Sequence, residues 1–154
     1  MTVPETVPEP SAVGVAPLAD AASEGASLDR AAEWRDDPQT LPRLRADPRT
    51  RVLVVRERRV PLGDGLILVP ADDAVLARTR EWALLGRRPD GSGLLLALQE
   101  PEDDTDADGS WAPRWSDLRE ALPLVDAADG ELVVAAIALA GWLRDAGFCP
   151  ACGS

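Results

Sequence analysis

The sequence predicts an α+β domain in which helices pack on an antiparallel sheet of at least four strands. Four short apolar runs follow one another between residues 51 and 99, and turns rich in Gly, Asp and Pro separate them. A long helical pattern, residues 126–147, comes after these runs. Because short turns reverse the direction of the chain, we expect neighbouring strands to pair antiparallel.

Composition sets limits on the class of protein. The chain has 154 residues, of which 45% are hydrophobic and 28% charged, as is typical of one globular domain with a tail. Its net charge of -11 argues against direct binding of nucleic acid or an anionic membrane surface, because both would be repelled. The chain contains no histidine, so histidine cannot act as a catalyst or ligand within it.

The amino-terminal region is expected to be a tail that precedes the folded domain. Residues 1–26 are rich in Pro, Val, Ala and Glu and have no helical or strand period, which predicts disorder. The first residues, "MTVPETVPEP", contain acids where a signal peptide needs a basic region. No apolar run approaches the roughly 20 residues of a membrane span. We therefore expect a cytoplasmic protein without membrane contact, with its domain at residues 27–146.

Two short helices are expected at the start of the domain. Ser27 can cap the first, in "SLDRAAEWRDDP", where Asp29, Arg30 and Arg35 are expected to pair and brace it. The second, in "PQTLPRLRADP", is only weakly indicated because Pro42 lies inside it.

The four predicted strands form two pairs. "RVLVV" (51–55) and "LILV" (66–69) predict a hairpin or meander, and "WALLGRR" (82–88) with "LLLALQ" (94–99) predicts a second hairpin around the turn "PDGSG". The segment between the pairs, "ADDAVLARTRE", predicts one or two helical turns. The next segment, "EPEDDTDADG" (100–109), has six carboxylates. We interpret it as a solvated loop, because its spacing does not match a calcium loop.

Two helices are predicted after this loop. Ser116 is expected to cap the first, and the second has a wide apolar stripe that must be buried, with Arg144 near its negative end and Gly147 as its stop. One flank of the stripe can alternatively face a partner chain. The stripe consists of Leu132, Ala136, Leu139 and Leu143, with Val133, Ile137 and Ala140 beside it. Among the tryptophans, Trp34, Trp82 and Trp142 are assigned to the core, and Trp111 and Trp115 stay unassigned.

Cys149 and Cys152 are the two cysteines of the chain, in "GFCPACGS" (147–154). This C-x-x-C turn directs two thiolates at one metal ion, and it is typical of the first half of a zinc ribbon. A closed structural zinc site needs four ligands, so these two residues form half of a site. A thioredoxin-like redox pair ranks last, because such a pair begins a helix whereas this one follows a helix.

The order of these features resembles the amino-terminal part of the NADH pyrophosphatase (NAD⁺ diphosphatase) family of Nudix hydrolases. The resemblance covers residues 27–154 and rests on "LDRAAEWRDDP", "RVLVV" with "LILV", "WALLGRR", "WSDLREALP", and the Trp142 helix that runs into "FCPACGS". It implies a degenerate Nudix-like domain, then a four-cysteine zinc ribbon whose first ligand pair is Cys149 and Cys152, then a catalytic domain. That family hydrolyses NADH or NAD⁺ to NMN(H) and AMP with Mg or Mn, and related enzymes remove NAD caps from RNA.

The catalytic Nudix box, with its R-E-x-x-E-E core, is absent from the sequence. The Arg-Glu pairs at residues 56–57, 80–81 and 119–120 lack the two further acids. We therefore expect a non-catalytic scaffold and dimerisation region, with NAD(H) bound only by a catalytic domain and the second cysteine pair lying downstream. The alternative is a stand-alone module, in which two chains complete one four-cysteine zinc site.

Overall fold

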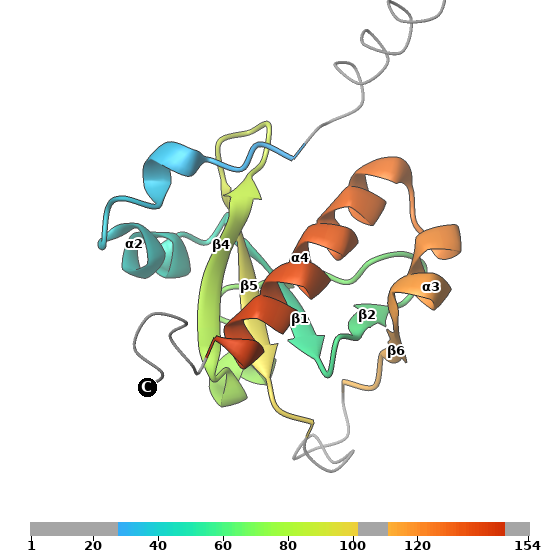
Figure 1. The fold of residues 1–154 in the computed structure, drawn as a ribbon. Coiled ribbons are helices and arrows are strands. Elements are labelled where there is room, and N and C mark those ends of the chain that lie inside the picture. Colours follow the sequence, from blue (N-terminus) through green and yellow to red (C-terminus); the bar gives the residue numbers. More distant parts are fainter. Residues whose placement is uncertain (1–27, 102–110, 147–154) are drawn as a thin grey trace, which may run out of the picture.

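A computed structural model describes residues 28–101 and 111–146, in which helices pack against a mixed sheet (Figure 1). The α+β class is thereby confirmed. The predicted tail and the half zinc ribbon lie outside the described residues, as does most of the acidic segment. In chain order the elements are η1 (Ala32–Trp34), α2 (Thr40–Ala46), β1 (Arg51–Arg56), β2 (Val60–Leu62), β3 (Val69–Pro70), η2 (Ala74–Arg78), β4 (Glu81–Arg87), β5 (Gly93–Gln99), β6 (Arg114–Ser116), α3 (Leu118–Ala121), η3 (Leu122–Leu124) and α4 (Ala127–Asp145).

The strand order is β3-β1-β5-β4, and the prediction of a purely antiparallel sheet is wrong at its centre. β3 pairs antiparallel with β1, and β4 with β5, as the two local pairings predicted. β1 and β5, however, run parallel from Arg51 opposite Leu94 to Arg56 opposite Gln99. Within this sheet these two strands are the most completely buried, and a strand buried on both faces belongs at the centre of a sheet. The connection between them is long enough to carry the chain back for a parallel pairing.

A second, smaller ribbon joins β2 to β6 antiparallel, from Val60 opposite Ser116 to Leu62 opposite Arg114. The sequence did not predict either strand. The expected strand at 66–69 is shorter than predicted, because only Val69–Pro70 pairs with β1. The β4–β5 turn forms as predicted, with Gly91 in the left-handed region at a φ of 85°.

Of the two helices predicted at the amino-terminal end of the domain, the weakly indicated second one forms, and the first is reduced to a single turn. α2 forms because it begins at Thr40, which places Pro42 in the first turn, where no backbone N–H is needed. The predicted first helix reduces to the single turn η1, and Ser27 lies outside the described residues. The reason is tertiary: Asp29 forms a strand-like bridge to Arg87, and Ala31 adopts a left-handed conformation with φ 45°.

The carboxy-terminal helices start at aspartates. Asp117, and not the predicted Ser116, caps α3: its carboxylate accepts the Glu120 N–H at 3.0 Å, and Glu120 accepts the Asp117 N–H at 3.3 Å. Ser116 instead ends β6. The long helix is confirmed as α4, which starts after the capping carboxylate of Asp126 and has Arg144 in its last turn. Its predicted stop at 147 lies outside the described residues. None of the described helices is long and apolar enough to cross a membrane.

The sheet has a separate core on each face, because side chains alternate along its strands. Leu53 and Val55 of β1 point toward α4, and they pack with its buried residues, which include Val133, Ala136 and Ile137. Val52 and Val54 of the same strand belong to the opposite core. The members of that second core include Ala31, Leu44, Val69, Leu76, Leu84, Leu95 and Ala97. Helix α4 is therefore held along its length by the sheet.

Candidate functional site

An apolar groove of about 340 Å³ is the candidate site, and it lies beside β4, an outer strand of the four-stranded sheet. One wall is the carboxy-terminal half of α4, which contributes Leu139, Trp142 and Leu143. The opposite wall comes from residues 34–41, with Trp34 and Leu41 among them, and Ala83 and Leu84 of β4 lie between the walls. A largely apolar concave surface of this size is typical of a site that receives a hydrophobic side chain or ligand.

Trp142 is the most exposed large hydrophobic side chain in the described residues, at 65% exposure. Its assignment to the core is therefore wrong. The buried face of α4 centres on Val133, Ala136, Ile137 and Ala140. Trp142 follows Ala140 by two residues, and a helix turns about 200° over that distance, so its side chain points away from the core. The sequence predicts a wide apolar stripe on this helix, but it does not indicate which side of the stripe packs on the sheet and which side stays exposed.

Arg87 holds the wall that carries Trp34. Its guanidinium lies 2.6 Å from an Asp29 carboxylate oxygen and 3.0 Å from a Glu33 oxygen, and its centre is 5.1 Å from the centroid of the Trp34 ring. The Ala31 N–H and Arg87 both donate to the Asp29 carboxylate, and these hydrogen bonds lower the pKa of that carboxyl below its ordinary value. We call this cluster the Arg87 clasp. Asp29 thus pairs with Arg87, which is remote in the sequence. The prediction that Asp29 pairs with Arg30 and Arg35 is wrong.

Gly86 lets the backbone of the Arg87 clasp approach β4. A Cβ at position 86 would lie 2.3 Å from the Asp29 carbonyl oxygen and 2.9 Å from Leu28 Cδ1. The same carbonyl accepts the Arg87 N–H at 2.7 Å. The segments "LDRAAEW" and "WALLG" are therefore directly packed together, although nothing in their local patterns pairs them.

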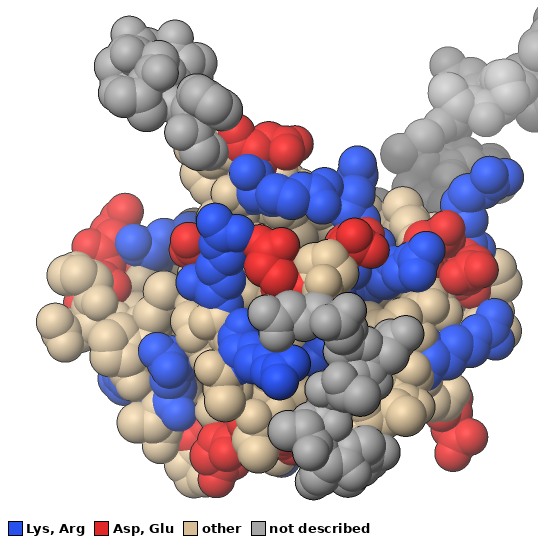
Figure 2. Space-filling model, turned by 90° about the horizontal axis from the view of Figure 1, so that it is seen from below, with Lys and Arg blue, Asp and Glu red and all other residues tan. Residues whose placement is uncertain are grey.

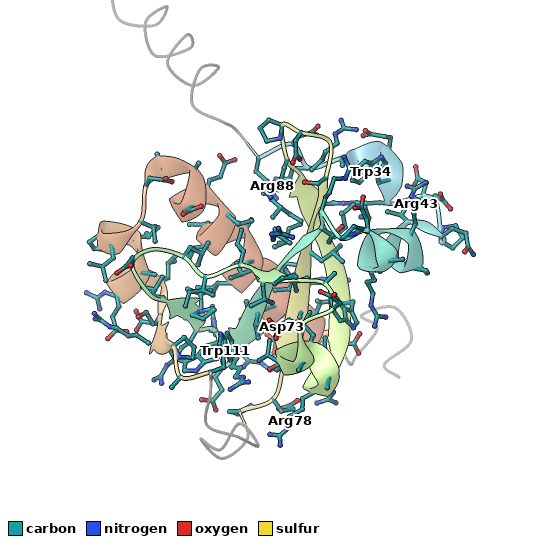
Figure 3. All side chains as sticks on the ribbon, turned by 180° about the vertical axis from the view of Figure 1, so that it is seen from behind. Trp34, Arg43, Asp73, Arg78, Arg88 and Trp111 are labelled. Atoms are coloured by element: carbon teal, nitrogen blue, oxygen red, sulfur yellow. The ribbon has the colours of Figure 1, made fainter. Side chains whose placement is uncertain are left out.

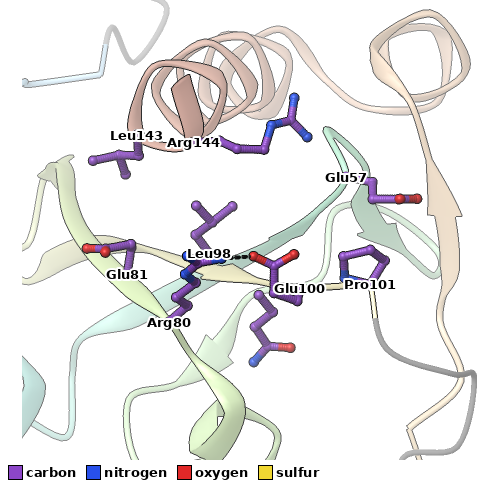
Figure 4. A pocket seen from close by; sticks show the side chains of 9 residues that line it. Glu57, Arg80, Glu81, Leu98, Glu100, Pro101, Leu143 and Arg144 are labelled. Atoms are coloured by element: carbon purple, nitrogen blue, oxygen red, sulfur yellow. Dashed lines mark hydrogen bonds and ion pairs between the residues drawn. The ribbon is translucent and has the colours of Figure 1, made fainter. Parts of the chain in front are cut away.

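A smaller pocket of about 190 Å³, lined by both charged and apolar side chains, lies near the carboxy-terminal end of α4 (Figure 4). Glu57, Arg80, Glu100 and Arg144 line it, and Arg80 forms an ion pair with Glu100. Both partners of that pair are more than half exposed, so the pair is screened by water. Within residues 28–101 and 111–146, no group of three or more His, Cys, Asp or Glu side chains could hold a metal ion.

Trp111 and Trp115, which the sequence left unassigned, form a structural cluster with Arg56. Their rings meet edge to face with centroids 5.4 Å apart, and the Arg56 guanidinium lies 4.7 Å from the Trp115 centroid. Arg56 Nε also donates to the Gln99 side chain at 3.0 Å, and Gln99 in turn donates to the Val75 carbonyl at 2.7 Å. In Figure 3, Trp111 lies well apart from Trp34, which lines the apolar groove. The polar groups of the cluster bond to one another, which favours a packing role.

The predicted metal ligands, Cys149 and Cys152, lie outside the described residues, as does the predicted zinc. The described part of the chain ends at Ala146, directly after α4. All 16 arginines lie in the described part, whereas nine of the 27 acids lie in residues 1–27 and 102–110. The described part is therefore close to neutral, and Figure 2 shows arginines and carboxylates interspersed on one of its faces.

Comparison with known proteins does not assign the chain to a family. No protein-family model matches it, and no curated protein matches it significantly.

Proposed function

We propose that this chain supplies the non-catalytic, Nudix-like amino-terminal scaffold of an NAD(H) diphosphatase. A catalytic domain of that enzyme would hydrolyse NADH or NAD⁺ to NMN(H) and AMP with Mg or Mn, and it could also remove NAD caps from RNA. Besides the ordered sequence features, one structural observation supports the proposal. Helix α4 is packed on the sheet and ends at Asp145, four residues before Cys149.

In this proposal the scaffold attaches the cysteine pair to a rigid element. Cys149 and Cys152 supply two of four zinc ligands, and the second pair and the Nudix box come from sequence beyond the first half of the ribbon. Two thiolates alone leave two coordination positions to water, so zinc should bind this chain weakly unless another chain completes the site. We propose the cytoplasm as its compartment, because thiolates stay reduced there.

We also propose that the scaffold forms a homodimer through an apolar surface made by η3 and the outer side of α4. Leu122, Leu124 and Val134 are 41%, 52% and 46% exposed. Leu122 Cδ2 lies 3.4 Å from the position of a Cβ on Gly130, one helical turn before Val134, so these side chains belong to one region. Exposed apolar side chains grouped in this way are typical of interaction surfaces. The described residues contain 16 arginines and 18 acids, so this part of the chain presents little net charge to a second copy.

The test measures activity, zinc content and molecular mass of the purified chain. We expect no AMP from NADH with Mg or Mn, and a dimer in sedimentation that survives chelation but is lost in Leu124→Glu. Cys149→Ser is the matched variant, which should leave that dimer intact.

Other outcomes have distinct meanings. Metal-dependent AMP release would refute the non-catalytic assignment. A dimer that contains half an equivalent of zinc per chain, and dissociates on chelation or in Cys149→Ser, would favour the stand-alone zinc-bridged module. A monomer under all conditions would refute dimerisation.

A further inference from the structure

We propose that Phe148 docks into the apolar groove and thereby fixes the cysteine pair against the folded domain. The occupant is thus the segment 147–154 of this same chain, which follows α4 directly. The inference does not depend on the NAD(H) diphosphatase assignment, because it concerns only the groove and the segment beside it.

The groove lies within reach of this segment. Trp142 and Leu143 line it from the last turns of α4, and Phe148 comes two residues after Ala146. An extended chain covers about 3.5 Å per residue, so the three residues from Asp145, the last residue of α4, to Phe148 can span about 10 Å. A reversal of direction after α4 would therefore be enough to bring the phenyl ring to the wall that contains Trp142.

The chemistry of the segment matches the groove. Residues 147–154 contain no acidic or basic side chain and include the sole phenylalanine of the chain. The other two segments outside the described residues are poor candidates, because 1–27 contains four carboxylates and 102–110 contains five. Burial of a carboxylate in an apolar groove is costly unless the charge is paired.

Two tryptophans line opposite walls of the groove and can hold a phenyl ring. Trp142 is 65% exposed, and the Arg87 guanidinium lies 5.1 Å from the centroid of the Trp34 ring. Aromatic rings prefer offset or edge-to-face contacts with each other. A ring between these walls would cover Trp142 and would place Cys149, the next residue, at the mouth of the groove.

The experiment uses the complete 154-residue chain, reduced and free of metal, with 4-fluorophenylalanine in place of phenylalanine. Because the chain has one phenylalanine, it gives one ¹⁹F resonance. We expect this resonance to differ from that of the labelled peptide GFCPACGS and to lose most of the relaxation enhancement that a soluble paramagnet causes in the peptide. The result should not change with protein concentration.

Two matched variants test the location. Leu41→Ala alters the groove wall that is remote in sequence, and should move the resonance toward the peptide value. Leu118→Ala removes the same group from another partly buried leucine, one that does not line the groove, and should leave the resonance unchanged.

Two results would overturn the proposal. One is a wild-type resonance with the shift and paramagnet accessibility of the peptide, a measurement that requires no variant to fold. The other is protection of the fluorine that increases with concentration, which would mean that Phe148 enters a second molecule.

Discussion

Gly86 offers the sharpest test of how the Arg87 clasp is built. In Gly86→Ala, the new Cβ would lie 2.3 Å from the carbonyl oxygen of Asp29 and 3.2 Å from its carbonyl carbon. These are backbone atoms, so the contact cannot be relieved by rotation of a side chain. The clasp segment must move away from β4, and the hydrogen bond from the Arg87 N–H to the Asp29 carbonyl, 2.7 Å long, is lost or lengthened.

Three contributions determine the size of the effect. Overpacking in a well-packed site costs about 1–3 kcal/mol. Loss of one backbone hydrogen bond costs about 0.5–1.5 kcal/mol. The lower entropy of alanine in the unfolded chain offsets about 0.4–1 kcal/mol of this cost. We expect a net loss of about 2 kcal/mol in the free energy of unfolding, which corresponds to a decrease in Tm of roughly 4–12 °C.

Thermal unfolding followed by circular dichroism measures this change, with Gly141→Ala as the control. A Cβ at position 141 meets no atom within 4 Å, and the residue lies inside α4. The same substitution there should raise stability by about 0.5–1 kcal/mol, because glycine is unfavourable within a helix. A Gly86→Ala protein that melts at or above the wild-type temperature would refute the reasoning. If the clasp is the cause, Asp29→Ala should cost less in the Gly86→Ala background than in the wild type.

Three further predictions concern caps, pH and the core. Asp117→Ala should lower the free energy of unfolding in urea by about 1 kcal/mol, because Asp117 caps α3. Ser116→Ala should lower it by less than half of that amount. A larger loss for Ser116→Ala than for Asp117→Ala would mean that Ser116 is the cap. The pKa of Asp29 lies below its ordinary 3.8 in the folded chain, so its contribution to stability is present above pH 3.8 and is lost as the pH falls through the folded pKa. Asp29→Asn should therefore weaken the acid dependence of Tm, and an unchanged dependence would contradict the hydrogen bonds described. Ile137→Ala should lower the free energy of unfolding in urea by about 2–5 kcal/mol, because Ile137 is buried. Trp142→Ala should lower it by less than about 1 kcal/mol, because Trp142 is exposed. Equal losses in the two variants would place Trp142 in the core.

The features that were predicted correctly depend on residues close together in the chain. The β4–β5 hairpin follows from two apolar runs around "PDGSG", where Gly91 adopts the positive φ that the turn needs. The length of α4 follows from its helical apolar period. The interpretation of Cys149 and Cys152 as a zinc half-site also depends on local spacing, and it stays a prediction.

The features that were missed depend on contacts between segments far apart in the sequence. β1 lies parallel to β5 because both strands are apolar enough for the centre of the sheet. Which strands take the central positions depends on all the strands together, so no local sequence pattern predicts it. Asp29 is extended because it is bonded to Arg87, 58 residues away, and that contact outweighs the local preference for helix. Trp142 is exposed because the sheet covers only one side of α4. Turns and periods are properties of neighbouring residues, so the amino-acid order specifies them directly, whereas the strand order, the Arg87 clasp and the apolar groove arise only when remote segments pack.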